Sequence, residues 1–142
     1  MIETFPIKVT TTGSAGSAAG SADSDPINGI LRAIRVDYHA SAPATTDLTV
    51  TELNSLGRTL LTKTDTATDD IVYPTVEADD AAFAAITDTV WPICIDGRVR
   101  VSVAQSNALA PAVTVWVQVE RCARLYCVNI TPMPRCDWNR AR

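Results

Sequence analysis

Hydrophobic and polar residues alternate along much of the chain, the pattern of a β-strand with one face buried and the other exposed to water. In residues 98–103, "RVRVSV", the three valines share one face, and the arginines and serine share the other. In residues 113–120, "VTVWVQVE", the four valines share one face and Trp116 lies on the opposite one. These two segments predict antiparallel strands whose valines form the core.

Shorter segments rich in β-branched residues predict further strands. They are residues 5–9, 30–40, 47–53, 58–64 and 70–76, with turn-forming residues between them. Residues 77–87, "EADDAAFAAIT", are equally compatible with a short helix and with a loop covering one end of the fold. The regular spacing of the predicted strands and turns indicates an all-β fold: a single antiparallel, jelly-roll-like β-sandwich domain with extended N- and C-terminal arms.

The two ends of the chain break the alternating pattern. Residues 10–26, "TTTGSAGSAAGSADSDP", hold almost no side chain large enough to pack in a core. Because a flexible segment of a dozen residues spans about 20 Å, we expect residues 1–12 to be an arm that reaches a neighbouring molecule. Residues 13–26 are then its flexible linker and residues 27–120 the sandwich; a loop within one sandwich is the alternative. Residues 121–142, with cysteines, tryptophan and arginines, are expected to be a C-terminal extension that binds protein.

Charge is unevenly distributed along the chain, whose net charge is −4 over 142 residues. Residues 1–120 hold 7 Lys and Arg against 15 Asp and Glu, a net −8, whereas residues 121–142 hold 5 Arg and one Asp, a net +4. An acidic body does not suit phosphate binding, so we expect a protein partner and no nucleic acid. No apolar run approaches the roughly 18 residues that span a bilayer, and no signal peptide is evident. We therefore expect no membrane association, and synthesis in the cytoplasm.

Residues that carry catalysis or bind a cofactor are scarce. His39 is the only histidine, at the end of a predicted strand, and no nucleotide-binding or hydrolase motif occurs. The carboxylates between residues 65 and 80 lack the spacing of a calcium loop and are interpreted as a solvated acidic edge. We therefore expect no enzyme activity, no cofactor and no metal.

The four cysteines leave their chemistry open. Cys122, Cys127 and Cys136 follow the spacing C-x₄-C-x₈-C, which fits a zinc site poorly. Reduced thiols, a disulfide and a metal site all remain as alternatives. Cys94, within "WPICI", is interpreted as a small buried hydrophobic residue.

Residues 27–120 resemble small virion proteins of tailed bacteriophages. The resemblance rests on the strand "IRVDY", the segments "SAPATTDLTVTE" and "LGRTLLT", the dipeptide "YP", and the strands "DGRVRVSVAQ" and "AVTVWV". It implies a β-sandwich of the phage head that decorates, or cements, the capsid, and it brings no catalytic residues. Residues after 120 lie outside the resemblance.

The expected function is that of a structural virion protein, assembled in the host cytoplasm, which binds the outer capsid surface and bridges neighbouring capsid subunits. The expected partners are the major capsid protein and further copies of the chain, in a trimer. Phe5, Ile7 and Val9 are expected to add a strand to a capsid sheet. The other expected contacts are Arg121, Arg124, Arg135 and Trp138. A phage tail or neck protein, and a carbohydrate- or receptor-binding module with an exposed tryptophan platform, are the alternatives.

Overall fold

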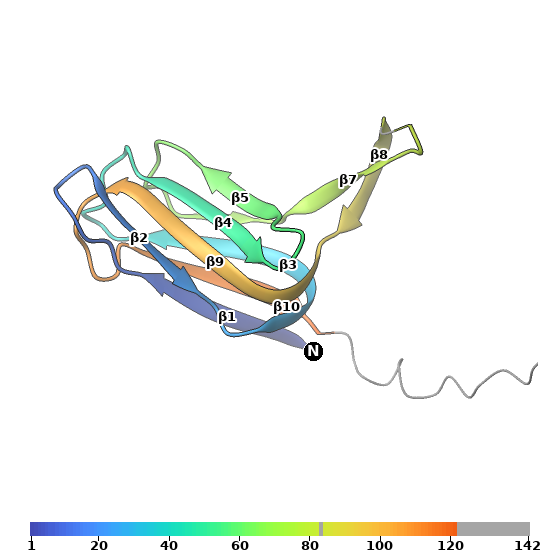
Figure 1. Cartoon of the computed structure of the whole chain (residues 1–142), viewed down its shortest axis with the longest axis horizontal. Helices are drawn as coiled ribbons and strands as arrows, with labels where there is room; N and C mark the ends of the chain where they lie inside the picture. Colours follow the sequence, from blue (N-terminus) through green and yellow to red (C-terminus); the bar gives the residue numbers. More distant parts are fainter. Residues whose placement is uncertain (83, 122–142) are drawn as a thin grey trace, which may run out of the picture.

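The chain folds into two layers of antiparallel strands, and one hairpin projects from them (Figure 1). The computed structural model describes residues 1–82 and 84–121, and in these residues it contains ten strands and no helix. The strands are β1 (Ile2–Val9), β2 (Ala18–Asp23), β3 (Ile27–Tyr38), β4 (Asp47–Leu53), β5 (Thr59–Lys63), β6 (Asp70–Val72), β7 (Thr75–Asp79), β8 (Ala85–Pro92), β9 (Cys94–Ser106) and β10 (Val113–Glu120). The predicted all-β, antiparallel, sandwich-like domain is confirmed. No helix in the described ranges is available to span a membrane.

One strand belongs to both layers. The first layer has the order β1-β10-β3, with β6 and the start of β9 along the other edge of β3. The second layer has the order β2-β9-β4-β5. Residues 94–97 of β9 pair with β3, and its later residues pair with β4 and β2. Gly97, at φ +131°, lies where β9 passes from one layer to the other.

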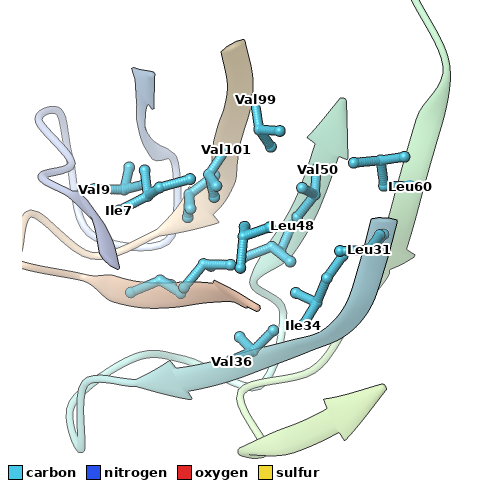
Figure 2. Packing of buried hydrophobic residues seen from close by; sticks show 14 of the residues in the cluster. Ile7, Val9, Leu31, Ile34, Val36, Leu48, Val50, Leu60, Val99 and Val101 are labelled. Carbon is cyan, nitrogen blue, oxygen red and sulfur yellow. The ribbon is translucent and has the colours of Figure 1, made fainter. Parts of the chain in front are cut away.

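The core lies between the two layers and consists mainly of valine, isoleucine and leucine (Figure 2). Both predicted valine faces are buried: every valine of β9 and β10 is at most 2% exposed. Burial of such a side chain contributes about 1.5–3 kcal/mol. Alternation is less regular in β3 because its register with β10 shifts between Gln118 and Val119. This bulge leaves Arg32 exposed although Leu31 and Ile34 both face the core.

The prediction that residues 1–12 form an arm is wrong. Residues 2–9 are β1, which pairs along its whole length with β10 of the same chain. Ile7 and Val9 are 2% and 0% exposed, so they belong to the core and cannot contact a partner. The outer edge of β1 also suits strand addition poorly. The backbone N–H and C=O groups of its even-numbered residues point away from β10, and Pro6, one of these residues, has no N–H to donate.

The prediction that residues 13–26 form a flexible linker is also wrong. Ser14–Ser17 make a turn, and residues 18–23 are β2, which pairs with β9. Small residues are needed here because β2 passes close to the end of β1. A Cβ on Gly20 would lie 2.1 Å from the carbonyl oxygen of Thr10, and Ala18 is completely buried. The sandwich therefore spans residues 2–120, not 27–120.

We predict that Gly20→Ala destabilises the fold by about 1–3 kcal/mol, since β2 must move away from Thr10 to admit the methyl group. Urea unfolding of the full chain measures this loss. Ser21→Ala, at the exposed neighbouring position, is the control and should change stability by less than about 0.5 kcal/mol. Equal stability of the two variants would show that β2 is not packed against this segment.

We also predict that stability falls between about pH 10 and pH 12 because of Tyr38. Burial, followed by the charges of Asp69, Asp47 and Asp70, raises the pKa of Tyr38 to about 12. The unfolded tyrosine loses its proton near its ordinary value of 10, so the folded state loses about 2–3 kcal/mol relative to it across this window. Below pH 10 the contribution is fully present.

Unfolding of Tyr38→Phe as a function of pH is the test. The buried Tyr38 hydroxyl has no hydrogen-bond partner among the described residues, so its removal should cost little at neutral pH. The variant should lose less stability than the wild type on going from pH 9 to pH 12. An identical alkaline decline in both proteins would contradict the assignment.

Candidate protein-binding surface

The projecting hairpin is built from β7 and β8. Its strands hold Thr75, Val76 and, across the turn, Ile86 and Val90, β-branched residues that favour extended backbone. The Asp80 carboxylate closes the turn by accepting hydrogen bonds from the amides of Ala82 at 2.7 Å and Ala84 at 3.0 Å. The helix considered for residues 77–87 is therefore wrong. Asp80 has a side chain that could cap the N-terminus of a helix, but here it follows the end of β7 and closes a turn.

Exposed hydrophobic side chains concentrate on this hairpin and the segment before it. Among the described residues, ten large hydrophobic side chains are exposed, and six of them lie between residues 71 and 91. We call these six the hairpin surface: Ile71, Tyr73, Val76, Ile86, Val90 and Trp91. Single exposed hydrophobic residues are ordinary, but several of them gathered in one region indicate an interaction site.

Two grooves meet at Tyr73, which is 71% exposed. One groove, of about 260 Å³, lies at the base of the hairpin and is lined by Val90, Trp91 and residues of β3. The other, of about 280 Å³, lies on the outer face of the first layer and is lined by Ile71 and Trp116 together with polar side chains. Hydrophobic, aromatic-lined grooves of this kind accept side chains of a partner.

Trp116 faces outward as predicted, but it is not an open platform. The Arg35 guanidinium lies over its ring, 5.0 Å from the centroid. Two hydrogen bonds of 3.0 Å each hold this guanidinium on the carboxylate of Asp37. One face of the indole is therefore covered within the chain.

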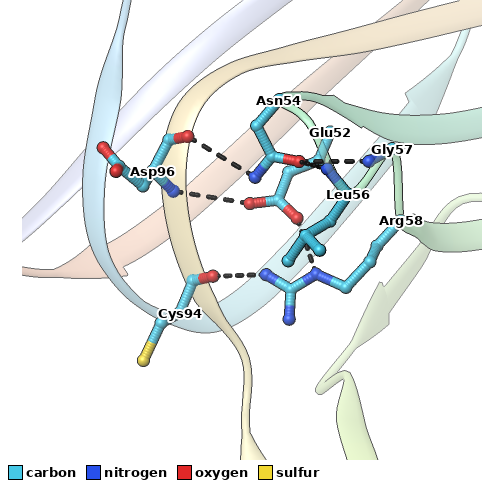
Figure 3. Close-up of polar contacts among 7 residues, drawn as sticks. All are labelled: Glu52, Asn54, Leu56, Gly57, Arg58, Cys94 and Asp96. Atoms are coloured by element: carbon cyan, nitrogen blue, oxygen red, sulfur yellow. Dashed lines mark hydrogen bonds and ion pairs between the residues drawn. The ribbon is translucent and has the colours of Figure 1, made fainter.

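A polar cluster fixes the position where the hairpin joins the body (Figure 3). Glu52 is 1% exposed and accepts a hydrogen bond of 2.8 Å from Arg58 Nε. Arg58 Nη2 donates in turn to the Cys94 carbonyl oxygen at 2.5 Å, and Glu52 Oε1 lies 3.4 Å from the Asp96 amide nitrogen. Since Cys94 comes two residues after the end of β8, this cluster sets the direction in which the hairpin leaves the sandwich.

Cys94 itself is exposed, so its interpretation as a buried residue is wrong. The neighbouring Ile93 and Ile95 are the buried residues, 5% and 1% exposed. The alternation of β9 therefore points the thiol outward. Cys122, Cys127 and Cys136 lie outside the described residues.

The predicted acidic edge is divided between the body and the hairpin. On the body, Asp69 accepts the Tyr38 amide at 2.7 Å, and a hydrogen bond from Lys63 lowers the pKa of Asp70. On the hairpin, four carboxylates are exposed and none forms an ion pair with another described residue: Glu77, Asp79, Asp80 and Asp88. Residues 75–92 contain no Lys or Arg, so the hairpin has a net charge of −4. In residues 1–82 and 84–121 no group of three potential metal ligands occurs.

The structure brings together only some of the residues expected to contact a partner. Phe5 is half-buried against the core, and the Arg121 guanidinium lies 6.0 Å from its ring and 2.7 Å from a Glu3 carboxylate oxygen. Arg121 is thus bound to β1 of its own chain, while its role toward a partner stays a prediction. Arg124, Arg135 and Trp138 lie outside the described residues. His39 caps its own strand end, where Nδ1 accepts the Ser41 amide.

Sequence reasoning missed the hairpin surface. Residues 70–76 and 85–92 have the alternation and β-branched content of ordinary sandwich strands, so nothing in the pattern showed that they leave the sandwich. The available signal was the run of carboxylates without any Lys or Arg, flanked by Tyr73 and Trp91. A hydrophobic segment with that charge cannot be fully buried.

We predict that Arg58→Met destabilises the chain by about 2–3 kcal/mol, because it leaves the Glu52 carboxylate buried without its partner. Arg100→Met is the matched control: it breaks the exposed pair with Asp23 and should cost less than about 1 kcal/mol. Urea unfolding gives both values. A cost for Arg58→Met as small as that of the control would show that the cluster does not hold the base of the hairpin.

Comparison with known proteins gives no relative: no protein-family model, curated protein or solved structure matches the chain.

Proposed function

We propose that the chain is a non-catalytic structural protein of a virion that decorates the capsid and binds neighbouring capsid subunits through the hairpin surface. The observation that supports a binding role is the hairpin itself, which projects from the sandwich and carries exposed hydrophobic side chains. A two-stranded hairpin by itself is at best marginally stable in water. Its apolar side chains therefore need a partner. The assignment to a virion rests on the resemblance of residues 27–120 to phage virion proteins.

The proposed mode of attachment differs from the one expected from the sequence. Residues 2–9 are part of the sandwich, so the element that reaches a capsid subunit is the internal hairpin. Tyr73 and Trp91 belong to the residue types that dominate binding energy at protein interfaces. A rigid body with one projecting contact suits bridging, because several copies in a closed ring make weak contacts collectively strong. A tail or neck protein would use the same surface.

A carbohydrate-binding module is the second candidate, and one observation favours it. Trp116 and Tyr73 line a groove together with Thr4, Arg35 and Gln118, a mixture of aromatic and polar groups that sugars bind. The stacking of Arg35 on Trp116 weighs against this candidate, because it occupies part of the aromatic surface. Binding of the isolated chain to a glycan array, lost in Trp116→Ala, would favour the carbohydrate role.

We predict that Tyr73→Ser and Trp91→Ser each weaken binding to capsids assembled from the major capsid protein by about 30-fold. Leu56→Ser is the control, since Leu56 is 70% exposed but lies on the β4–β5 loop outside the hairpin surface. Co-sedimentation with increasing protein concentration measures the three affinities. Wild-type chain that does not bind capsids would refute the decoration role. Equal binding by all variants would refute the assigned surface.

A further inference from the structure

The hairpin surface has no cover among the described residues, although both faces of the hairpin carry exposed apolar side chains. Val76 lies directly opposite Trp91, and Glu77 lies opposite Val90, in the register of the two strands. Val76, Val90 and Trp91 are 44%, 57% and 62% exposed. An exposed hydrophobic strand edge of this kind is liable to aggregate unless another segment covers it.

The charge of the hairpin indicates the kind of segment that suits it. Its four carboxylates give a net charge of −4 with no basic residue between positions 75 and 92. Residues 122–142 hold four arginines and one aspartate, a net charge of +3, so they carry the opposite charge. They also carry large apolar side chains: Leu125, Tyr126, Val128, Ile130, Met133 and Trp138.

The chain leaves the sandwich beside the base of the hairpin. Glu120, at the end of β10, pairs with Ile30 of β3, and Ile30 pairs on its other side with Cys94 of β9. The end of β10 and the base of the hairpin are thus two strand spacings apart, about 10 Å. Figure 1 shows both at the same end of the sandwich. The 21 residues from 122 to 142 span up to about 70 Å when extended, more than the roughly 26 Å of an eight-residue strand.

From these three observations we infer that residues 122–142 bind the hairpin surface of the same chain, with their arginines facing the four carboxylates of the hairpin. A tethered segment this close has an effective concentration near millimolar, which favours the same chain over a second copy in dilute solution. The apolar side chains of the segment cover those of the hairpin. This inference does not depend on the proposed role in a virion. For a capsid subunit to bind the hairpin surface, residues 122–142 must first leave it.

Photo-crosslinking of the full chain tests the inference. A photoreactive phenylalanine derivative at Val76 should give adducts with peptides from residues 122–142 within one chain. The same derivative at Leu56, which is exposed but outside the hairpin surface, is the control and should give at least about tenfold fewer such adducts. Adducts that join two chains, or equal adducts from both positions, would overturn the inference.

Charge variants of the full chain supply a second readout. The variant Glu77→Gln/Asp79→Asn/Asp88→Asn removes three of the four hairpin carboxylates that would face the arginines. Asp80 is kept because it closes the turn. The yield of adducts from position 76 should fall about tenfold, because the contributions of three exposed ion pairs to binding together amount to about that factor. Half-molar salt should reduce the wild-type yield similarly. A yield unchanged in the variant and in salt would overturn the electrostatic part of the inference.

Discussion

The burial of two valine faces, one from β9 and one from β10, is the interaction on which the rest of the structure depends. β10 lies at the centre of the first layer, between β1 and β3, while β9 is central to the second layer and also pairs with β3. β9 therefore both supplies core side chains and joins the two layers. Because β8 ends at Pro92 and β9 starts at Cys94, the fixed position of β9 also determines where the hairpin ends.

Among the described residues, one buried ion pair, Glu52–Arg58, connects this core to the base of the projecting hairpin. Glu52 on β4 and Arg58 before β5 hold the start of β9 through the Cys94 carbonyl oxygen and the Asp96 amide. A buried carboxylate is costly unless it is paired, so the Arg58 guanidinium is held next to Glu52, beside the point where β8 leads into β9. The arrangement gives a rigid base to an element that otherwise has only two strands.

The parts of the fold that alternation determines were predictable, and those that depend on strand pairing were not. Val99, Val101 and Val103 predict a buried face, because alternate residues of a strand point to the same side of the sheet. Residues 2–9 carry the same alternation, yet their pairing with β10 is a contact more than a hundred residues away in sequence. The small residues of 13–24 indicate flexibility as readily as close packing, and only the approach of Gly20 to Thr10 decides between the two. The hairpin surface was missed for a related reason: a strand pattern does not reveal whether a second layer covers it.

The central claim is that β1 belongs to the rigid body and that the hairpin is the element available for binding. Hydrogen–deuterium exchange of the full chain, free and bound to capsids, tests this claim most directly. The account predicts that the amides of Glu3, Phe5 and Ile7, which face β10, exchange as slowly as those of β10 in both states, and that binding changes exchange within residues 75–92. Amides of β1 that exchange much faster than those of β10 in the free chain and slow down on binding would contradict it.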